Sequence, residues 1–202
     1  MHDPAGTISA RVVHIDQCDA QPWRNGVGMT RRIATGKDRS DGPAWTLSLA
    51  DIETDSDFST FPGLDRTAVV VGDDPIDIVV NGSVRTIGLL DRIVFAGEEE
   101  VRARPTRGPS RLLNLMTKRA THAGSITLHH LRGTRELSNA DGVAWMVLAG
   151  SLATGTHTLR RWDTVILDDA PITLTGAATV AAVVVTSAAP PETTALIEEN
   201  HS

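Results

Sequence analysis

A chain of 202 residues with a formal net charge of −6 has room for one large β domain or two small ones. Its arginines are scattered and form no basic stripe, so the composition argues against nucleic acid as a partner. The longest apolar run, residues 181–185, is far too short to span a bilayer, and the N-terminus lacks a signal-peptide pattern. The single cysteine, Cys18, has no partner for an internal disulfide. We therefore expect a soluble, cytoplasmic protein that is not bound to a membrane.

Short apolar stretches separated by turn residues predict an all-β protein. In chain order, the expected strands are residues 11–15, 30–34, 45–50, 67–71, 76–80, 84–90, 91–95 and 101–104. Asn81-Gly82, between two apolar runs, is a strong signal for a tight hairpin turn. The acidic run 51–57 is interpreted as a solvated strand edge, because it lacks the central glycine and the terminal glutamate of a calcium loop.

Residues 110–119 fit both helical and strand periodicity, and an internal repeat favours the strand. Four segments recur in the same order further along the chain: 70–72, 91–95, 101–103 and 113–116 match 148–150, 163–167, 172–174 and 180–184. We therefore expect two small jelly-roll β-barrel modules packed together. The first module takes residues 1–120, a turn-rich insert 121–142, the second module 143–189 and a loose tail 190–202.

The stretch from Phe58 to Arg66 is the most distinctive part of the sequence, because a Pro-Gly turn leads into a buried apolar strand. A guanidinium after such a rigid turn loses little entropy, and its planar fork suits a carboxylate. The sequence therefore predicts an anion pocket with six candidate ligand-binding residues: Arg66, Asn25, Asn114, Arg31, Trp23 and Phe58. The plainer alternative is that Asp65 pairs with Arg66 and that Asn25-Gly26 serves only as a turn.

The histidines do not form a metal-binding pattern. Seven of them are scattered through the chain, without a His-x-His pair, and a strand would send His129 and His130 to opposite faces. The chain also lacks a Ser/His/Asp order with a strained glycine elbow. We therefore expect no metal, no cofactor and no catalytic residue.

Four blocks within residues 20–120 resemble the HutD/Ves family of bacterial cupins, which is associated with histidine utilisation. The first block contains Trp23, Asn25, Gly26, Gly28, Thr30 and Arg31. The second contains Phe58-Ser59, Phe61-Pro62-Gly63 and Asp65-Arg66. The third and fourth are Phe95-x-Gly97 with Glu98, and Asn114 with Met116 and Lys118-Arg119. The chain departs from the family pattern at three positions: Arg32 and Leu112 replace acidic residues, and Val27 interrupts a glycine run.

The resemblance implies a two-barrel cupin fold (a bicupin) without a metal, which binds a small acidic metabolite of the formylglutamate or urocanate class. It also implies a regulatory role in histidine breakdown. One alternative is an isomerase or amidohydrolase acting on a related ligand, with His157 or Glu98 as the general base in a barrel mouth. Another is a structural protein whose apolar faces allow a homodimer.

Overall fold

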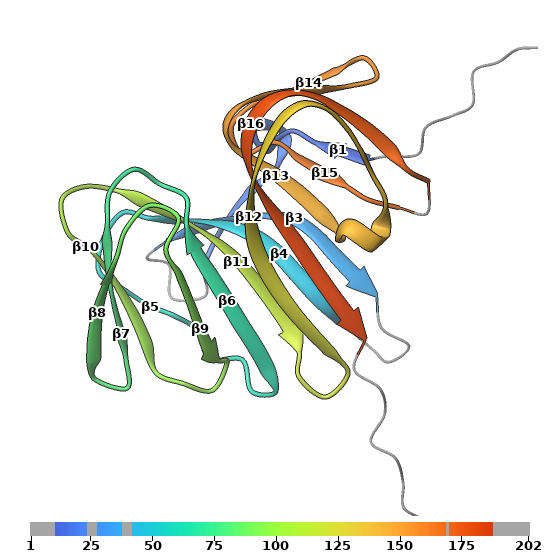
Figure 1. Cartoon of the computed structure of the whole chain (residues 1–202). Coiled ribbons are helices and arrows are strands. Elements are labelled where there is room, and N and C mark those ends of the chain that lie inside the picture. Colours follow the sequence, from blue (N-terminus) through green and yellow to red (C-terminus); the bar gives the residue numbers. More distant parts are fainter. Residues whose placement is uncertain (1–10, 24–27, 38–41, 169, 188–202) are drawn as a thin grey trace, which may run out of the picture.

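The structure, a computed structural model, describes residues 11–23, 28–37, 42–168 and 170–187. These residues form sixteen strands and two short 3₁₀ turns, η1 (Ile15–Gln17) and η2 (Asn139–Asp141), so the all-β expectation is confirmed (Figure 1). No helical segment in these ranges is long and apolar enough to cross a bilayer. The expected loose tail, residues 190–202, lies outside the described residues.

The strands belong to three sheets. The central sheet has the order β2 (Ala20–Pro22), β3 (Met29–Lys37), β4 (Pro43–Ile52), β11 (Ser110–Lys118), β6 (Leu64–Val70) and β9 (Arg92–Ala96). The small sheet has the order β5 (Ser56–Asp57), β10 (Val101–Pro105), β7 (Ile76–Val80) and β8 (Ser83–Ile87). The C-terminal sheet has the order β1 (Arg11–Val13), β15 (Thr164–Ile166), β13 (Ala144–Thr154), β16 (Ile172–Ser187) and β12 (His122–Leu137), with β14 (His157–Leu159) also paired to β13.

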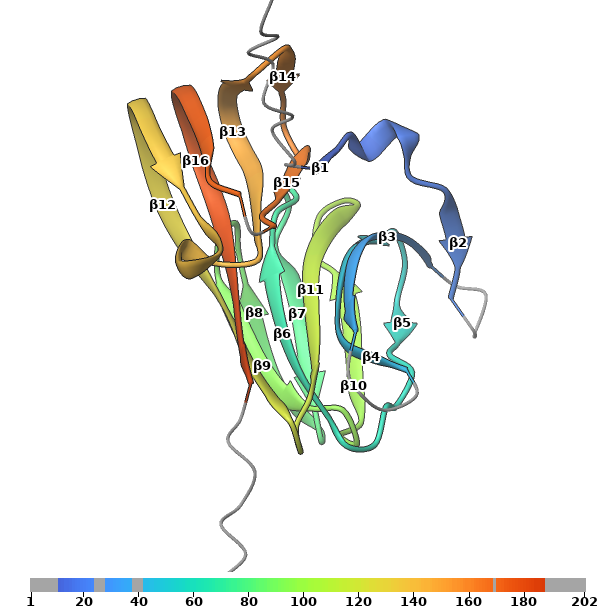
Figure 2. The same cartoon turned by 90° about the vertical axis from the view of Figure 1, so that its right-hand side faces the viewer.

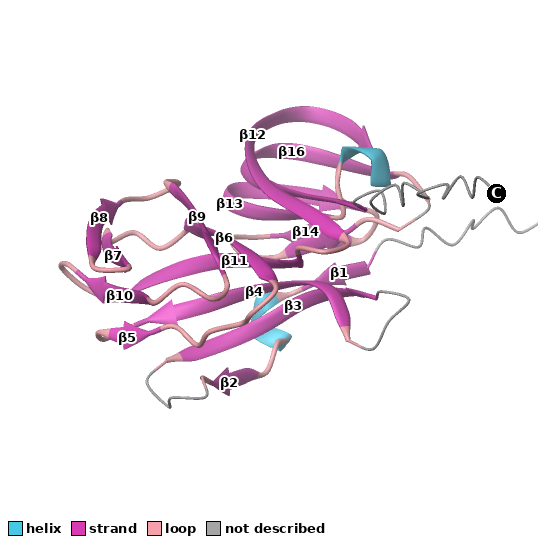
Figure 3. Ribbon diagram, turned by 90° about the horizontal axis from the view of Figure 1, so that it is seen from below, coloured by secondary structure: helices cyan, strands magenta, loops and turns pink. Residues whose placement is uncertain are grey.

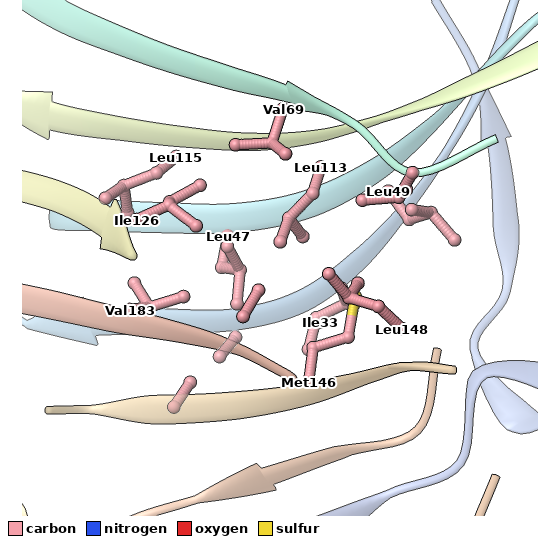
Figure 4. Packing of buried hydrophobic residues seen from close by; sticks show 14 of the residues in the cluster. Ile33, Leu47, Leu49, Val69, Leu113, Leu115, Ile126, Met146, Leu148 and Val183 are labelled. Carbon is pink, nitrogen blue, oxygen red and sulfur yellow. The ribbon is translucent and has the colours of Figure 1, made fainter. Parts of the chain in front are cut away.

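Three strands of the central sheet, β4, β11 and β6, are buried on both faces, because the small sheet lies on one side and the C-terminal sheet on the other (Figure 3). Alternation along β11 shows how the sequence achieves this: Leu113 and Leu115 join the core shared with the C-terminal sheet, whereas Leu112 joins the core shared with the small sheet. Figure 4 shows Leu47, Leu49 and Leu113 facing Met146 and Val183 across the first of these cores.

Side chains on the two faces of β4 show this burial. The alternation of Trp45, Leu47 and Leu49 is present, but Ala50 and Ile52 on the other face are also buried. The C-terminal sheet curls around a third core, which includes Leu131, Trp145, Val165 and Leu174. Three sheets rather than two closed barrels therefore make up the part of the chain that the structure describes.

Two expectations about local structure are confirmed. Residues 110–118 form a strand, and Asn81-Gly82 joins β7 to β8 with positive φ angles of 47° and 81° at the two turn residues.

The expected insert 121–142 and the first strand differ from the prediction. Residues 122–137 form β12, which pairs with β16 over its whole length of 16 residues. Their exposed, polar side chains suggested a turn, but one face of an edge strand is free to meet solvent. The first strand, β1, pairs with β15 rather than with the strands of the first half (Figure 2).

The expected repeat corresponds only in part to equivalent strands. In the central sheet, four neighbours lie in the order β4-β11-β6-β9, and in the C-terminal sheet four neighbours lie in the order β12-β16-β13-β15. Numbered along the chain, each set has the spatial order 1-4-2-3. Three of the four matching segments fall on corresponding members of the two sets. The remaining one does not, because residues 101–103 lie on β10 of the small sheet whereas their counterpart 172–174 lies on β16.

Candidate functional site

A pocket of about 490 Å³ lies against the central sheet, on the face that looks toward the small sheet. Its wall includes side chains from β2, β3, β4, β6 and β11, and from the segment before β6. Apolar rings and polar groups share this wall: Trp23, Trp45, Phe58, Phe61, Thr30, Arg32, Ser48, Arg66 and Asn114 are among its residues.

Strand register brings Arg66 and Asn114 to the same part of this face. Arg66 lies opposite Met116 on β11, and Asn114 lies opposite Ala68 on β6. Because side chains alternate, Arg66 and Ala68 share one face of β6 while Thr67 and Val69 take the other. The sequence-predicted pair therefore does meet in one pocket.

The turn before β6 holds the pocket wall by backbone hydrogen bonds. Phe61 N–H donates to the Gly97 carbonyl, and Gly97 N–H donates to the Leu64 carbonyl, both at 2.7 Å. Gly63 has a φ of 81°, a conformation that favours glycine. The Phe-Pro-Gly motif thus fixes the backbone from which Arg66 emerges.

Arg66 is 5% exposed and has few polar partners. Its terminal nitrogens donate weakly, to the Ser59 carbonyl at 3.4 Å and to Asn114 Oδ1 at 3.5 Å, and its buried Nε has no partner among the described residues. The guanidinium lies over the rings of Phe58 at 4.8 Å and Phe95 at 4.9 Å. Burial in these surroundings lowers the pKa of Arg66 to about 10, so the group is charged at neutral pH.

Asp65 does not neutralise Arg66, so the plainer alternative is wrong on this point. Asp65 accepts from Arg119 Nε at 2.6 Å, and Arg119 also donates to Glu98 at 2.8 Å. Glu98 accepts from Gly63 N–H as well, and the hydrogen bond from Arg119 is the main reason why the pKa of Glu98 falls to about 2. Among the described residues, no carboxylate lies within ion-pairing distance of Arg66.

The other predicted site residues are placed as follows. Trp23 and Phe58 line the pocket and touch edge to face, with ring centroids 5.6 Å apart. Asn25 lies outside the described residues. Arg31 does not line the pocket: its Nη1 pairs with Asp51 at 2.6 Å, and Asp51 also pairs with Arg111 at 2.5 Å.

The structure corrects two interpretations of the sequence, one for Asp51 and one for Arg31. Asp51 is 8% exposed and bridges two arginines, so it is not part of a solvated edge, although Asp55 and Asp57 of the same run are exposed. The pocket position expected for Arg31 belongs to its neighbour Arg32. The signal for this was available, since alternation on β3 places Arg32 on the same face as Thr30.

The described side chains that could act as a general acid or base, or bind a metal, do not line this pocket. Neither Glu98 nor His157 lines the pocket; the ring of His157 lies 5.9 Å from that of His14. His129 packs against Trp145 and His130 bonds Thr179 on the other face of β12, as expected from alternation. No group of three or more potential metal ligands occurs within the described ranges.

A second hollow of about 400 Å³ lies between the η1 segment and the turn after β14. Asp163 lines this hollow and accepts hydrogen bonds from His14 Nδ1 at 3.1 Å, Ile15 N–H at 3.1 Å and Arg160 N–H at 2.9 Å. Both carboxylate oxygens are thus engaged in holding the N-terminal segment against this turn, which is a structural role.

The family model and the curated relatives that match this chain agree with the HutD/Ves resemblance of its sequence. The family model described as HutD matches residues 16–184. A 21.2 kDa protein in the hutC 3′ region of Pseudomonas putida is 37% identical over 97 residues, or 47% of this chain and 51% of that protein. Protein Ves of Escherichia fergusonii is 32% identical over 98 residues, or 48% of this chain and 51% of that protein. The chain spans about half the length of the curated relatives it matches.

Solved structures share the fold. HutD from Pseudomonas fluorescens SBW25, in a formate condition, has a TM-score of 0.75 and 24% identity, covering 90% of this chain and 100% of that one. A cupin 2 conserved barrel domain protein from Leptotrichia buccalis has a TM-score of 0.58 and 12% identity, covering 87% of this chain and 96% of that one. The fold is therefore cupin-like.

Proposed function

Because the chain belongs to the HutD family, we propose that it binds a small acidic metabolite through Arg66 and regulates histidine utilisation from the cytoplasm. The single observation that carries the binding proposal is the buried guanidinium of Arg66, which lines a pocket without any carboxylate partner among the described residues. An unpaired buried charge is unfavourable by several kcal/mol, and an incoming carboxylate would offset that penalty.

The neighbours of Arg66 suit a ligand with a carboxylate and a second polar group. Asn114 uses Oδ1 to accept from Arg66, so its amide N–H groups are free to donate to a formyl or carbonyl oxygen. The rings of Trp23 and Phe58 offer an apolar wall for the body of the ligand. Formylglutamate and urocanate, the class implied by the sequence resemblance, have this combination of groups.

The link with histidine utilisation rests on the family and on the relative in the hutC 3′ region. A catalytic role on the same ligand would need a general base at the pocket. None of the described residues that line the pocket is a histidine, aspartate or glutamate. The arrangement therefore favours binding over the alternative isomerase or amidohydrolase activity.

We further propose that the chain consists of two cupin modules. The matching strand order of the central and C-terminal sheets supports this division. Because β12 is the first strand of the second set, the boundary would lie near residue 120 rather than within a separate insert.

The test is thermal unfolding with urocanate, formylglutamate, formiminoglutamate, histidine and glutamate, each with the wild type and with Arg66→Met. A ligand at a hundred times its dissociation constant adds about 2.7 kcal/mol, which raises the midpoint by about 5–10 °C. We expect such a shift with at least one acid, and no shift in Arg66→Met. A wild type that responds to none of these acids would contradict the proposal.

A further inference from the structure

Arg32 is a second cation at the same pocket, and it comes from another strand of the same sheet face. Arg32 lies on β3 and Arg66 on β6, with β4 and β11 between them. Both side chains line the one pocket of about 490 Å³. Three interstrand spacings place the two backbones about 14 Å apart, so the guanidinium groups reach the pocket from different walls.

The described residues do not neutralise the charge of Arg32. Its neighbour Arg31 leaves β3 on the other face and pairs with Asp51, but no described carboxylate lies within ion-pairing distance of Arg32. The described residues that line the pocket include two arginines and no acidic residue. In a chain with a net charge of −6, this is a local concentration of positive charge.

The surface between the two arginines is polar. Register places Arg32 opposite Ser48, and Ser48 opposite Asn114, so these three residues form a cross-strand row that ends near Arg66. Ser48 and Asn114 are both buried and both line the pocket. A ligand that spans the row meets hydrogen-bonding groups at its middle and a cation at each end.

From this juxtaposition we infer that the pocket selects dianions: one anionic group binds Arg66, and a second, several bonds away, binds Arg32. The inference rests on the proposed function. It specifies the charge of the ligand and names Arg32 as the residue that recognises the second anionic group. The buried Arg66 binds the first carboxylate of the ligand. The exposed Arg32 makes the affinity for a dicarboxylate higher than the affinity for the same molecule with one carboxylate removed.

The experiment uses matched probes whose size is constant and whose charge differs by one. Isothermal titration measures the dissociation constants of succinate, glutarate and adipate, and of their monoamides, at low salt. For the dicarboxylate of the best-fitting length, we expect the wild type to bind the dianion about fivefold more tightly than its monoamide, the effect of a partly exposed ion pair. In Arg32→Gln this ratio should fall to about one, and in Arg32→Glu it should invert.

Arg85→Gln is the control, because Arg85 is an exposed arginine of β8 that does not line the pocket. It changes the net charge equally and should leave the ratio unaltered. A ratio that stays the same in Arg32→Gln and Arg32→Glu would overturn the role of Arg32 while leaving the Arg66 pocket intact. A wild type that binds none of the six probes would overturn this inference, and the acid panel above then decides separately whether the Arg66 pocket binds acids at all.

Discussion

Asp65 and Arg66 are neighbours in the chain, but they take part in separate interactions on opposite faces of β6. Asp65 pairs with Arg119 at the surface, while Arg66 is 5% exposed and lies among aromatic rings. Strand alternation is the cause, because successive side chains on a strand point to opposite faces. The positive charge of Arg66 therefore remains available in the pocket.

We expect Arg66→Met to preserve or increase stability while abolishing acid binding. Replacing a buried, poorly paired charged group by an apolar side chain of similar length is neutral or stabilising, by up to about 4 kcal/mol. Arg66→Ala should instead lose stability, because it leaves a cavity beside the rings of Phe58 and Phe95. Urea unfolding of the three proteins checks this order. A clear loss of stability in Arg66→Met would mean that the guanidinium itself holds the fold.

Alkaline pH should weaken binding and reduce the stability difference between wild type and Arg66→Met. Burial lowers the pKa of Arg66 to about 10, so the unfolded chain holds this proton more tightly than the folded one. The penalty for the buried charge is present at neutral pH and disappears as pH rises through about 10 toward the pKa of unfolded arginine. Acid affinity should be constant from pH 7 to 9 and fall about tenfold per unit above 10. Titration calorimetry across this range checks the fall; a constant affinity up to pH 11 would contradict it.

Asp51→Asn should destabilise the protein by about 2–4 kcal/mol, because it removes the partner of two partly buried arginines. Asp51 is 8% exposed and pairs with both Arg31 and Arg111. Asp55→Asn is the matched control from the same acidic run: Asp55 pairs with Arg104 in solvent, and its loss should change stability by less than about 1 kcal/mol. Equal effects in urea unfolding would show that burial does not distinguish the two carboxylates.

Gly97→Ala should disturb the turn that precedes β6. A Cβ atom at Gly97 would collide with the Phe61 carbonyl, and its neighbour in space is backbone rather than a flexible side chain. We expect a loss of about 1–3 kcal/mol together with weaker acid binding, since the turn positions Arg66. Gly88→Ala is the control, because the nearest atom to its Cβ would be Asp91 Oδ2 at 3.9 Å. The prediction fails if both variants unfold and bind like the wild type.

Much of the fold was accessible from the sequence because the central strands show regular alternation. Leu47, Leu49, Leu113 and Leu115 have the period of two that an apolar face requires, and Asn81-Gly82 marks a hairpin. Strand β12 was missed because it lies at a sheet edge, where exposed polar residues weaken the pattern. The pairing of β1 with β15 joins residues about 150 positions apart, and local patterns contain no information on such a contact.

The site was predicted in part. Arg66 and Phe58 follow from the Pro-Gly turn and the residues beside it, whereas Trp23 and Asn114 belong to blocks of the family resemblance. Arg31 was chosen where Arg32 belongs, because a motif identifies a segment but only strand alternation decides which of two adjacent side chains faces the pocket. The burial of Asp51 also depends on tertiary contacts, since nothing within the run 51–57 distinguishes it from Asp55.

The burial of β4, β11 and β6 on both faces means that the two halves of this chain are not separable parts. Expressed without the C-terminal sheet, the first half would present Leu47, Leu49, Leu113 and Leu115 to water as one continuous apolar wall. Truncating the gene, or exchanging one half with a relative, would therefore yield insoluble protein unless a matching C-terminal sheet covers this wall. The pocket differs in this respect, because Thr30 and Arg32 lie on the strand next to the sheet edge and line the pocket. Substitutions there would change the lining of the pocket without repacking either core.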